Sequence, residues 1–192
     1  MPDMTTVIYL PGLGGKYDRF RMWALKLWKR RDRNVVFLPM DWTSPYESFI
    51  EKKSRVIRAV SDSEGQVVII GESAGAAMGL LIAHEMPHVK FIAFCGKIGG
   101  AKSTGSFYYE RVPAFADMLP LADTVRTNLR ADEKLGMITV RAYKDLFLSV
   151  RDTTIPGVRQ IVLPSVGHLT TIVLGITILR FGLLRAIRQL TK

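Results

Sequence analysis

Short apolar runs alternate with longer amphipathic segments along the whole chain. Most of these runs are apolar at successive positions, not at every second one, which is typical of strands covered on both faces. The expected strands are, in chain order, 6–10, 35–38, 67–71, 90–95, 138–142 and 159–163. The chain is therefore expected to contain a sheet whose two faces are both buried.

Four of the intervening segments have the length of helices, namely 18–31, 46–60, 74–86 and 168–190. In 46–60 the apolar side chains recur at the spacing of one helix face; they are Tyr46, Phe49, Ile50, Ile57 and Val60. Regular alternation of strands and helices requires parallel pairing with right-handed crossovers. We therefore predict an α/β fold, a three-layer α/β/α sandwich with a mostly parallel sheet of about six strands.

The length of 192 residues fits one domain, 1–192, with a sizeable core. Apolar residues make up 48% and charged residues 23% of the chain, which excludes a disordered protein. Residues 97–136 form the longest interval without an expected strand. We expect this interval to hold a small cap or an irregular insertion.

The net charge of +10 comes partly from a basic cluster in 19–33 and from the C-terminal segment. A solvated surface is the ordinary interpretation, and attraction to nucleic acid or to an anionic membrane is the alternative. The cluster lacks the interleaved aromatic and basic residues of a nucleic-acid module, so we expect no nucleic-acid partner.

No stretch resembles a secretory signal, because strand-like sequence begins at Thr6 without a leading basic region. The longest uncharged apolar stretches are shorter than the ~20 residues that span a bilayer. We therefore expect a cytoplasmic protein.

The segment VVIIGESAGAAMG places Ser73 between two glycines, where a buried strand should turn into a helix. Gly71 and Gly75 leave room for a tight turn that lifts the serine hydroxyl above the sheet edge. The amides at the start of the next helix would stabilise negative charge there. The pattern G-x-S-x-G in this setting predicts a nucleophile elbow.

A serine nucleophile needs a base and a group that orients the base. Of the three histidines, His168 is the one that follows the last expected strand. Asp145 lies just after the strand 138–142, and Asp152 is the rival acid seven residues on. Asp145 is preferred because it lies closer to the strand end. The order Ser73, Asp145, His168 along the chain is also the order in which this α/β architecture uses such residues.

An acyl-transfer site also needs amide donors for the oxyanion. The Ala74 amide follows the nucleophile, and the first strand runs into LPGLGG. Gly12 and Gly14 allow this loop to approach a substrate closely, so Leu13 is the expected second donor. Alone, the loop would be an ordinary glycine-rich turn.

The stretch HEMPH, from His84 to His88, has the letters of a zinc-peptidase motif, which requires both imidazoles on one unbroken helix. Pro87 interrupts the helix, so we expect no metal here. Cys95 lies in an apolar run and is expected to be a buried, inert thiol.

Together, VIYLPGLGG, GESAG, Asp145 and His168 resemble the α/β-hydrolases over essentially the full chain. The P-G-x-G-G loop and the segment Asp145-Leu146-Phe147 are more narrowly similar to small single-domain serine hydrolases of the retinoblastoma-binding-protein type. The resemblance implies a minimal α/β-hydrolase fold with little or no lid. It also implies esterase, lipase-like, thioesterase or amidase chemistry on a small acyl substrate, without a cofactor. An acyltransferase with the same acyl-enzyme and a non-catalytic interaction protein remain alternatives.

The segment 168–190 shows two apolar stripes when it is drawn as one helix. The first is the expected core face and contains Ile172, Ile176, Leu183, Ile187 and Leu190. The second contains Leu174, Ile178 and Phe181 and is continued by cations. Apolar residues beside cations fit a membrane surface or a second copy of the chain, so we expect weak contact of one of these kinds; coverage of the stripe by a neighbouring helix is the alternative.

Overall fold

Six strands lie side by side in one sheet of a computed structural model, which describes residues 4–101 and 110–192. They are β1 (Thr5–Leu10), β2 (Arg33–Phe37), β3 (Gln66–Glu72), β4 (Lys90–Phe94), β5 (Met137–Lys144) and β6 (Arg159–Val166). Their order is β2-β1-β3-β4-β5-β6, and each neighbouring pair is parallel. The prediction of a parallel sheet of about six strands is confirmed.

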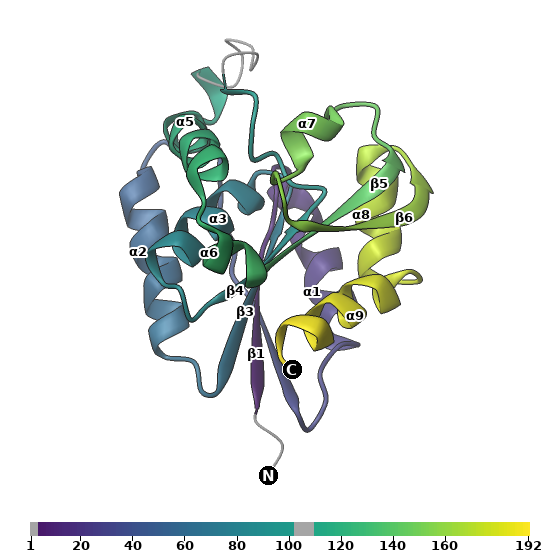
Figure 1. Cartoon of the computed structure of the whole chain (residues 1–192). Helices are drawn as coiled ribbons and strands as arrows, with labels where there is room; N and C mark the ends of the chain where they lie inside the picture. Colours follow the sequence, from purple (N-terminus) through teal and green to yellow (C-terminus); the bar gives the residue numbers. More distant parts are fainter. Residues whose placement is uncertain (1–3, 102–109) are drawn as a thin grey trace.

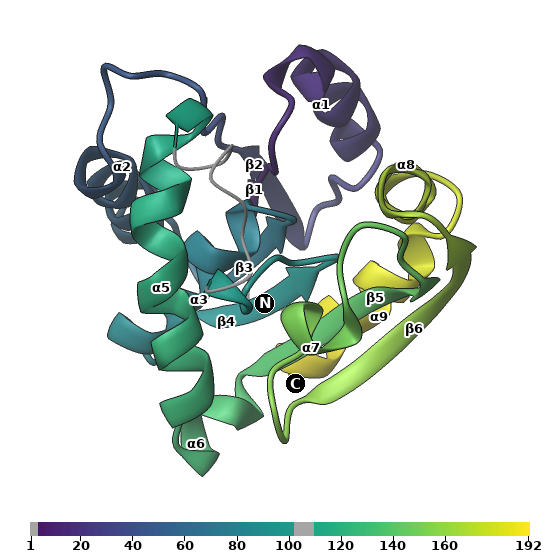
Figure 2. The same cartoon turned by 90° about the horizontal axis from the view of Figure 1, so that it is seen from above.

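Helices cover both faces of the sheet, which confirms the three-layer prediction (Figures 1 and 2). One face carries α2 (Phe49–Ser61), α3 (Gly75–Glu85) and α5 (Pro113–Asn128), followed by the short α6 (Ala131–Leu135). The other face carries α1 (Asp18–Lys26), α8 (His168–Ile176) and α9 (Arg180–Leu190). A short 3₁₀ helix, η1 (Gly15–Tyr17), precedes α1, and α7 (Val150–Thr153) lies between β5 and β6.

The central strands are apolar at successive positions because each face packs into its own core. In β1, Val7 and Tyr9 belong to the core under α1, α8 and α9, whereas Ile8 and Leu10 belong to the core under α2, α3 and α5. All four side chains are fully buried. This double burial explains the continuous apolar runs of the sequence.

Helix α2 begins three residues later than the predicted 46–60, because Ser48 caps it. The Ser48 hydroxyl accepts a hydrogen bond from the Glu51 amide, and the Glu51 carboxylate accepts one from the Ser48 amide. Tyr46 therefore lies outside the helix and is exposed, and Ile50 is also exposed. The prediction of an apolar stripe was wrong at these two positions. Lys52, which is not apolar, is instead one of the buried residues of α2.

The predicted helix 168–190 is two helices, α8 and α9, bent by 69° at the break between them. The Trp28 indole donates a hydrogen bond to the carbonyl of Ile176, the last residue of α8. The expected core face is buried at Ile172, Ile176, Leu183 and Ile187. The second stripe is not one continuous helix face, because Ile178 lies in the break.

None of the described helices is by itself both long and apolar enough to cross a membrane, and α8 with α9 meets that test only as a bent pair. Ile178 and Phe181 are exposed. Contact of this segment with a membrane surface or a second copy stays a prediction.

Of the interval 97–136, the structure describes 97–101 and 110–136. The helix α5 packs against α2 and α3 on one face of the sheet. Whether the remaining residues of the interval cap the site stays a prediction.

The chain changes direction across the sheet between β1 and β3. From β1 it passes to β2 on one side, and from β3 it continues to β4 on the other side. Open α/β sheets bind ligands outside the carboxyl ends of the strands at such a point. Leu10 pairs with Gly71, so the loop after β1 and the turn after β3 begin at the same level.

Replacing Trp28 by phenylalanine tests the contact that joins the end of α1 to α8. The variant keeps most of the buried ring but leaves the Ile176 carbonyl without its donor, which should lower the free energy of unfolding by about 1–3 kcal/mol. Urea unfolding followed by circular dichroism measures this. Trp23→Phe is the matched control, because Trp23 lies on α1 and is 57% exposed; equal losses in both variants would contradict the assignment.

Candidate active site

Ser73 occupies a strained turn between β3 and α3. Its φ of 49° lies in the left-handed region, which a residue with a side chain rarely adopts. The Ser73 amide donates to the Phe94 carbonyl at 3.0 Å, and the Ser73 carbonyl accepts from the Lys97 amide at 2.9 Å. These two backbone hydrogen bonds hold the turn from the neighbouring strand and its following loop.

Gly71 and Gly75 give this turn the room that the sequence led us to expect. A Cβ atom on Gly71 would collide with the backbone of Ala76, and one on Gly75 would collide with the Leu10 carbonyl. Strand, turn and helix are therefore packed too closely for any side chain at either position.

The structure brings the three residues of the predicted triad together. The Ser73 hydroxyl lies 3.0 Å from Nε2 of His168, and Nδ1 of His168 lies 2.7 Å from Oδ2 of Asp145. His168 is the first residue of α8, and Asp145 directly follows β5. Three segments far apart in the sequence thus meet at the carboxyl edge of the sheet.

Asp145 is the acid that contacts the imidazole. Its other oxygen, Oδ1, accepts hydrogen bonds from the amides of Phe147 (2.8 Å) and Leu148 (3.0 Å), which fix the direction of the carboxylate. Asp152 lies in α7 and pairs with the Lys97 ammonium at 3.0 Å. The exposed Phe147 ring packs edge-on against the His168 ring, with centroids 6.3 Å apart.

The loop after β1 lies directly against the serine. A Cβ atom on Gly12 would stand 2.6 Å from the Ser73 Cβ, and Gly14 has a φ of 90°. Among the described residues, the amides of Leu13 and Ala74 have no hydrogen-bond acceptor. One predicted oxyanion donor thus directly follows Ser73, and the other directly follows Gly12, whose backbone lies against Ser73.

A buried ion pair, which the sequence analysis missed, connects the loop to the turn. Glu72 precedes Ser73, and its carboxylate accepts from Nε (2.8 Å) and Nη2 (2.5 Å) of Arg21, from the Tyr9 hydroxyl (2.6 Å) and from the Gly12 amide (3.3 Å). The Arg21 guanidinium also donates to the Gly14 carbonyl at 3.1 Å. We call Glu72, Arg21 and Tyr9 the buried clamp.

The clamp changes the acid–base properties of its members. Burial raises the pKa of Tyr9, and the charge of Glu72 adds to the increase. Burial opposes the positive charge of Arg21, but the hydrogen bond and the charge of Glu72 outweigh it and raise the Arg21 pKa. Each group therefore keeps its form, a neutral phenol and a guanidinium, across the range in which proteins fold.

The interpretation of 19–33 as a solvated basic cluster was wrong for Arg21 and Arg33, which are 3% and 6% exposed. A signal was present in the sequence, because Glu72 follows four apolar strand residues and a glycine. A carboxylate in such a place requires a buried partner. The sequence pattern does not identify which cationic residue is the partner of Glu72.

The other candidate residues are engaged elsewhere. His84 contacts Glu133, with 2.6 Å between Nδ1 and the carboxylate, and α3 ends at Glu85, before Pro87. Within 4–101 and 110–192, no cluster of three or more metal-ligating side chains could hold an ion. Cys95 is buried, and burial raises the pKa of its thiol.

No family model matches the chain, and no curated protein matches it in sequence. Solved structures do match it in fold. The structure described as that of LipS and LipT, metagenome-derived lipolytic enzymes, aligns with a TM-score of 0.69 and 10% identity over 99% of this chain and 94% of its own. A pyrethroid hydrolase from Sphingobium faniae JZ-2 aligns with a TM-score of 0.63 and 16% identity, covering 98% and 97%.

A third similar structure is MGS-MChE2, an α/β-hydrolase enzyme from the metagenome of lagoon sediments at Mar Chica, Morocco. It aligns with a TM-score of 0.65 and 12% identity over 97% of this chain and 92% of its own. Identities this low establish a shared fold and nothing about substrates. The chain therefore has the α/β-hydrolase fold.

Proposed function

We propose that this protein is a serine hydrolase that cleaves a carboxylic ester or thioester through an acyl-enzyme. The observation that carries the proposal is the chain of hydrogen bonds from Ser73 to His168 to Asp145, at 3.0 and 2.7 Å. The names of similar structures, a lipolytic enzyme and a pyrethroid hydrolase, agree with ester cleavage. The narrower likeness to the retinoblastoma-binding-protein type and a cytoplasmic location stay predictions.

In the acylation step, Nε2 of His168 takes the proton of the Ser73 hydroxyl as Oγ attacks the substrate carbonyl carbon. Asp145 holds the imidazole by Nδ1 and stabilises its charged form. The carbonyl oxygen becomes an oxyanion beside the amides of Leu13 and Ala74 at the start of α3. His168 then gives its proton to the leaving alcohol or thiol, and the acyl group remains on Ser73.

In the deacylation step, His168 removes a proton from a water molecule that attacks the acyl-enzyme. Collapse of the second tetrahedral intermediate returns the proton to Ser73 and releases the carboxylic acid. An acyltransferase would differ only in using an alcohol or amine in place of water. A non-catalytic interaction protein would not need a hydroxyl, an imidazole and a carboxylate in this order.

In this scheme the buried clamp holds the loop after β1, which carries the Leu13 amide and which we call the oxyanion loop. Glu72 binds the Gly12 amide, and Arg21 binds the Gly14 carbonyl, so the backbone is fixed on both sides of Leu13. An oxyanion donor is effective only when it is already in place before the charge develops. Glu72 and Arg21 therefore act as positioning residues for the oxyanion donors.

Replacing Ser73 by alanine should abolish hydrolysis of p-nitrophenyl acetate and labelling by a fluorophosphonate probe, because the nucleophile is gone. The circular dichroism spectrum should not change. Ser54→Ala, at an exposed position of α2, is the control and should keep both activities. Turnover in Ser73→Ala at the wild-type rate would refute the assignment.

Asp145→Asn should lower kcat by about 10⁴-fold, because the amide no longer holds the productive tautomer of the imidazole. Asp152→Asn is the matched control and should leave kcat nearly unchanged, since its carboxylate pairs with Lys97. Steady-state hydrolysis of p-nitrophenyl acetate measures both variants. A larger loss in Asp152→Asn would reverse the two assignments.

Glu72→Gln should lower kcat more than it raises KM, because the loop would lose its anchor while the substrate pocket remains. It should also lower the free energy of unfolding, by up to about 3–5 kcal/mol, since the buried Arg21 would keep only the partly buried Asp18 as its counter-charge. Glu85→Gln, which breaks an exposed pair with Lys53, is the control.

Tyr9→Phe tests the same clamp with a milder change, removing one donor and costing about 1–2 kcal/mol of stability. Its kcat should lie between those of the wild type and Glu72→Gln. A wild-type kcat in a folded Glu72→Gln variant would show that the clamp only stabilises the fold.

A further inference from the structure

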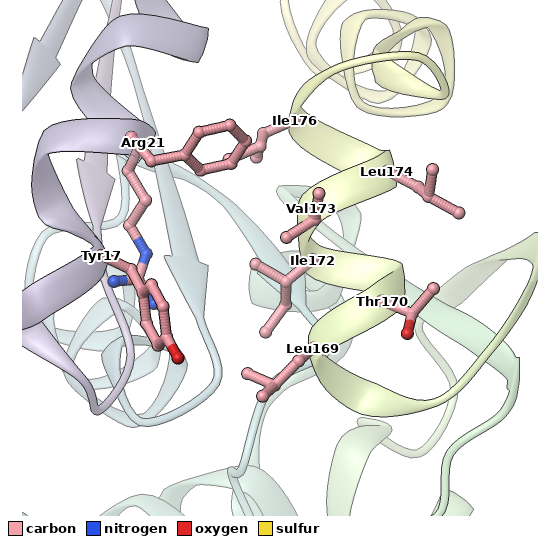
Figure 3. Close-up of a pocket in the computed structure, with 9 residues that line it drawn as sticks. Tyr17, Arg21, Leu169, Thr170, Ile172, Val173, Leu174 and Ile176 are labelled. Carbon is pink, nitrogen blue, oxygen red and sulfur yellow. The ribbon is translucent and has the colours of Figure 1, made fainter.

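An apolar groove lies between α1 and α8, and its lining includes Leu169, which directly follows His168 (Figure 3). Its volume is about 410 Å³, within the range of ~300–1,000 Å³ that is usual for small-molecule sites. The lining residues are Tyr17, Phe20, Arg21, Leu169, Thr170, Ile172, Val173, Leu174 and Ile176. Nearly all of this lining is hydrocarbon.

The α8 wall of the groove is one helical stripe. Leu169, Ile172, Val173 and Ile176 follow the spacing i, i+3, i+4, i+7 and so share a face. In Figure 3, Leu169, Ile172 and Val173 point from α8 across the gap toward Tyr17. Ile172 and Ile176 are buried at the base, whereas Leu169 and Val173 are about half exposed at the rim.

The groove begins at the catalytic edge of the sheet. Leu169 directly follows His168 on one wall, and on the other wall Arg21 binds Glu72, the residue before Ser73. Figure 2 looks down on this edge and shows α1 and α8 side by side there. A substrate carbonyl at Ser73 would thus lie next to the open end of the groove.

The far end of the groove lies at Ile176, where α8 is joined to the segment after α1. The Trp28 indole, which is almost fully buried, donates to the Ile176 carbonyl there at 2.9 Å, and we take this contact as the end of the groove. From Leu169 to Ile176, α8 advances about 10 Å at ~1.5 Å per residue. This length of the groove along α8 therefore suits a hydrocarbon chain of medium length.

The charges around the groove exclude an ionic occupant. The guanidinium of Arg21 is 3% exposed and is engaged by Glu72, by Asp18 and by the loop carbonyls of Leu13 and Gly14. It offers no free donor to a carboxylate or phosphate in the groove. An uncharged apolar chain is therefore the ligand that this lining can bind.

We propose that this groove is the acyl site of the enzyme and selects medium-chain acyl groups, hexanoyl to decanoyl, over acetyl. The proposal rests on the proposed function, because it places the acyl carbon at Ser73. Each methylene buried in the groove should raise kcat/KM about three- to fourfold. The increase should stop when the chain reaches the end of the groove at Trp28.

The test measures kcat/KM for p-nitrophenyl esters from acetate to dodecanoate in the wild type, Val173→Trp and Val162→Trp. Val173 lies on the groove rim and is 44% exposed, whereas Val162 lies on β6 and is 43% exposed, so the two substitutions are matched. Val173→Trp should lower octanoate hydrolysis roughly tenfold or more by displacing several methylenes. Acetate is the reference substrate, so the ratio of octanoate to acetate kcat/KM should fall in Val173→Trp and keep its wild-type value in Val162→Trp.

If kcat/KM does not change with acyl length, or changes in the same way in the two variants, the proposal of an acyl groove is overturned. Hydrolysis of acetate would in that case still support the proposed function. Light scattering gives a separate outcome: a wild-type dimer that Val173→Trp converts to a monomer would assign the groove to a second copy of the chain and overturn the proposal.

Binding of octanamide to Ser73→Ala, followed by ligand-observed NMR, tests the groove without catalysis. Binding that is lost in Ser73→Ala/Val173→Trp and kept in Ser73→Ala/Val162→Trp supports the groove even if no ester is hydrolysed. In that case the proposed function alone would fail. Absence of binding in all three proteins would overturn the groove.

Discussion

The left-handed turn at Ser73 is the constraint on which the rest of the site depends. A residue with a side chain in this conformation costs about 1–3 kcal/mol, and the surrounding structure must supply that energy. Here the backbone groups of Phe94 and Lys97, at the end of β4 and after it, form hydrogen bonds with the backbone of Ser73. Closely packed backbone also fills the space at Gly71 and Gly75. His168 is held independently, after β6, so a relaxed turn would break the 3.0 Å contact between the two side chains.

A second consequence of this turn is the buried charge beside it. The residue before the serine faces the interior, and its carboxylate at Glu72 would be costly without a partner. Arg21 supplies the opposite charge in two hydrogen bonds, and Tyr9 and Gly12 complete the shell. Hydrophobic residues could fill the same space at equal or lower cost. What they could not do is hold the polar backbone of the loop after β1 against the elbow.

The sheet and the three meeting side chains could be predicted from the sequence, because both follow from local signals. Doubly buried strands leave continuous apolar runs, and the segments carrying Ser73, Asp145 and His168 each end a strand at the same edge. The buried clamp could not be predicted in full, since Arg21 lies in a basic cluster and its burial depends on how α1 packs against β2 and α8 and on the contact with Glu72 at the end of β3. The break between α8 and α9 was missed for the same reason, because a helical periodicity does not reveal the tertiary contacts at the end of α8, such as that of Trp28 with Ile176.

The helix α1 connects the oxyanion loop to the proposed acyl groove. Arg21 binds the elbow and the loop, the Tyr17 side chain faces α8, and Trp28, just past the helix end, binds the Ile176 carbonyl. The separation of α1 from α8 and the position of the loop are therefore fixed by the same short segment. A change that widens the groove by shifting α1 must also move Arg21 relative to Glu72. In the proposed enzyme, chain-length selectivity and oxyanion stabilisation would for this reason change together, whereas changes on the α8 wall would alter selectivity alone.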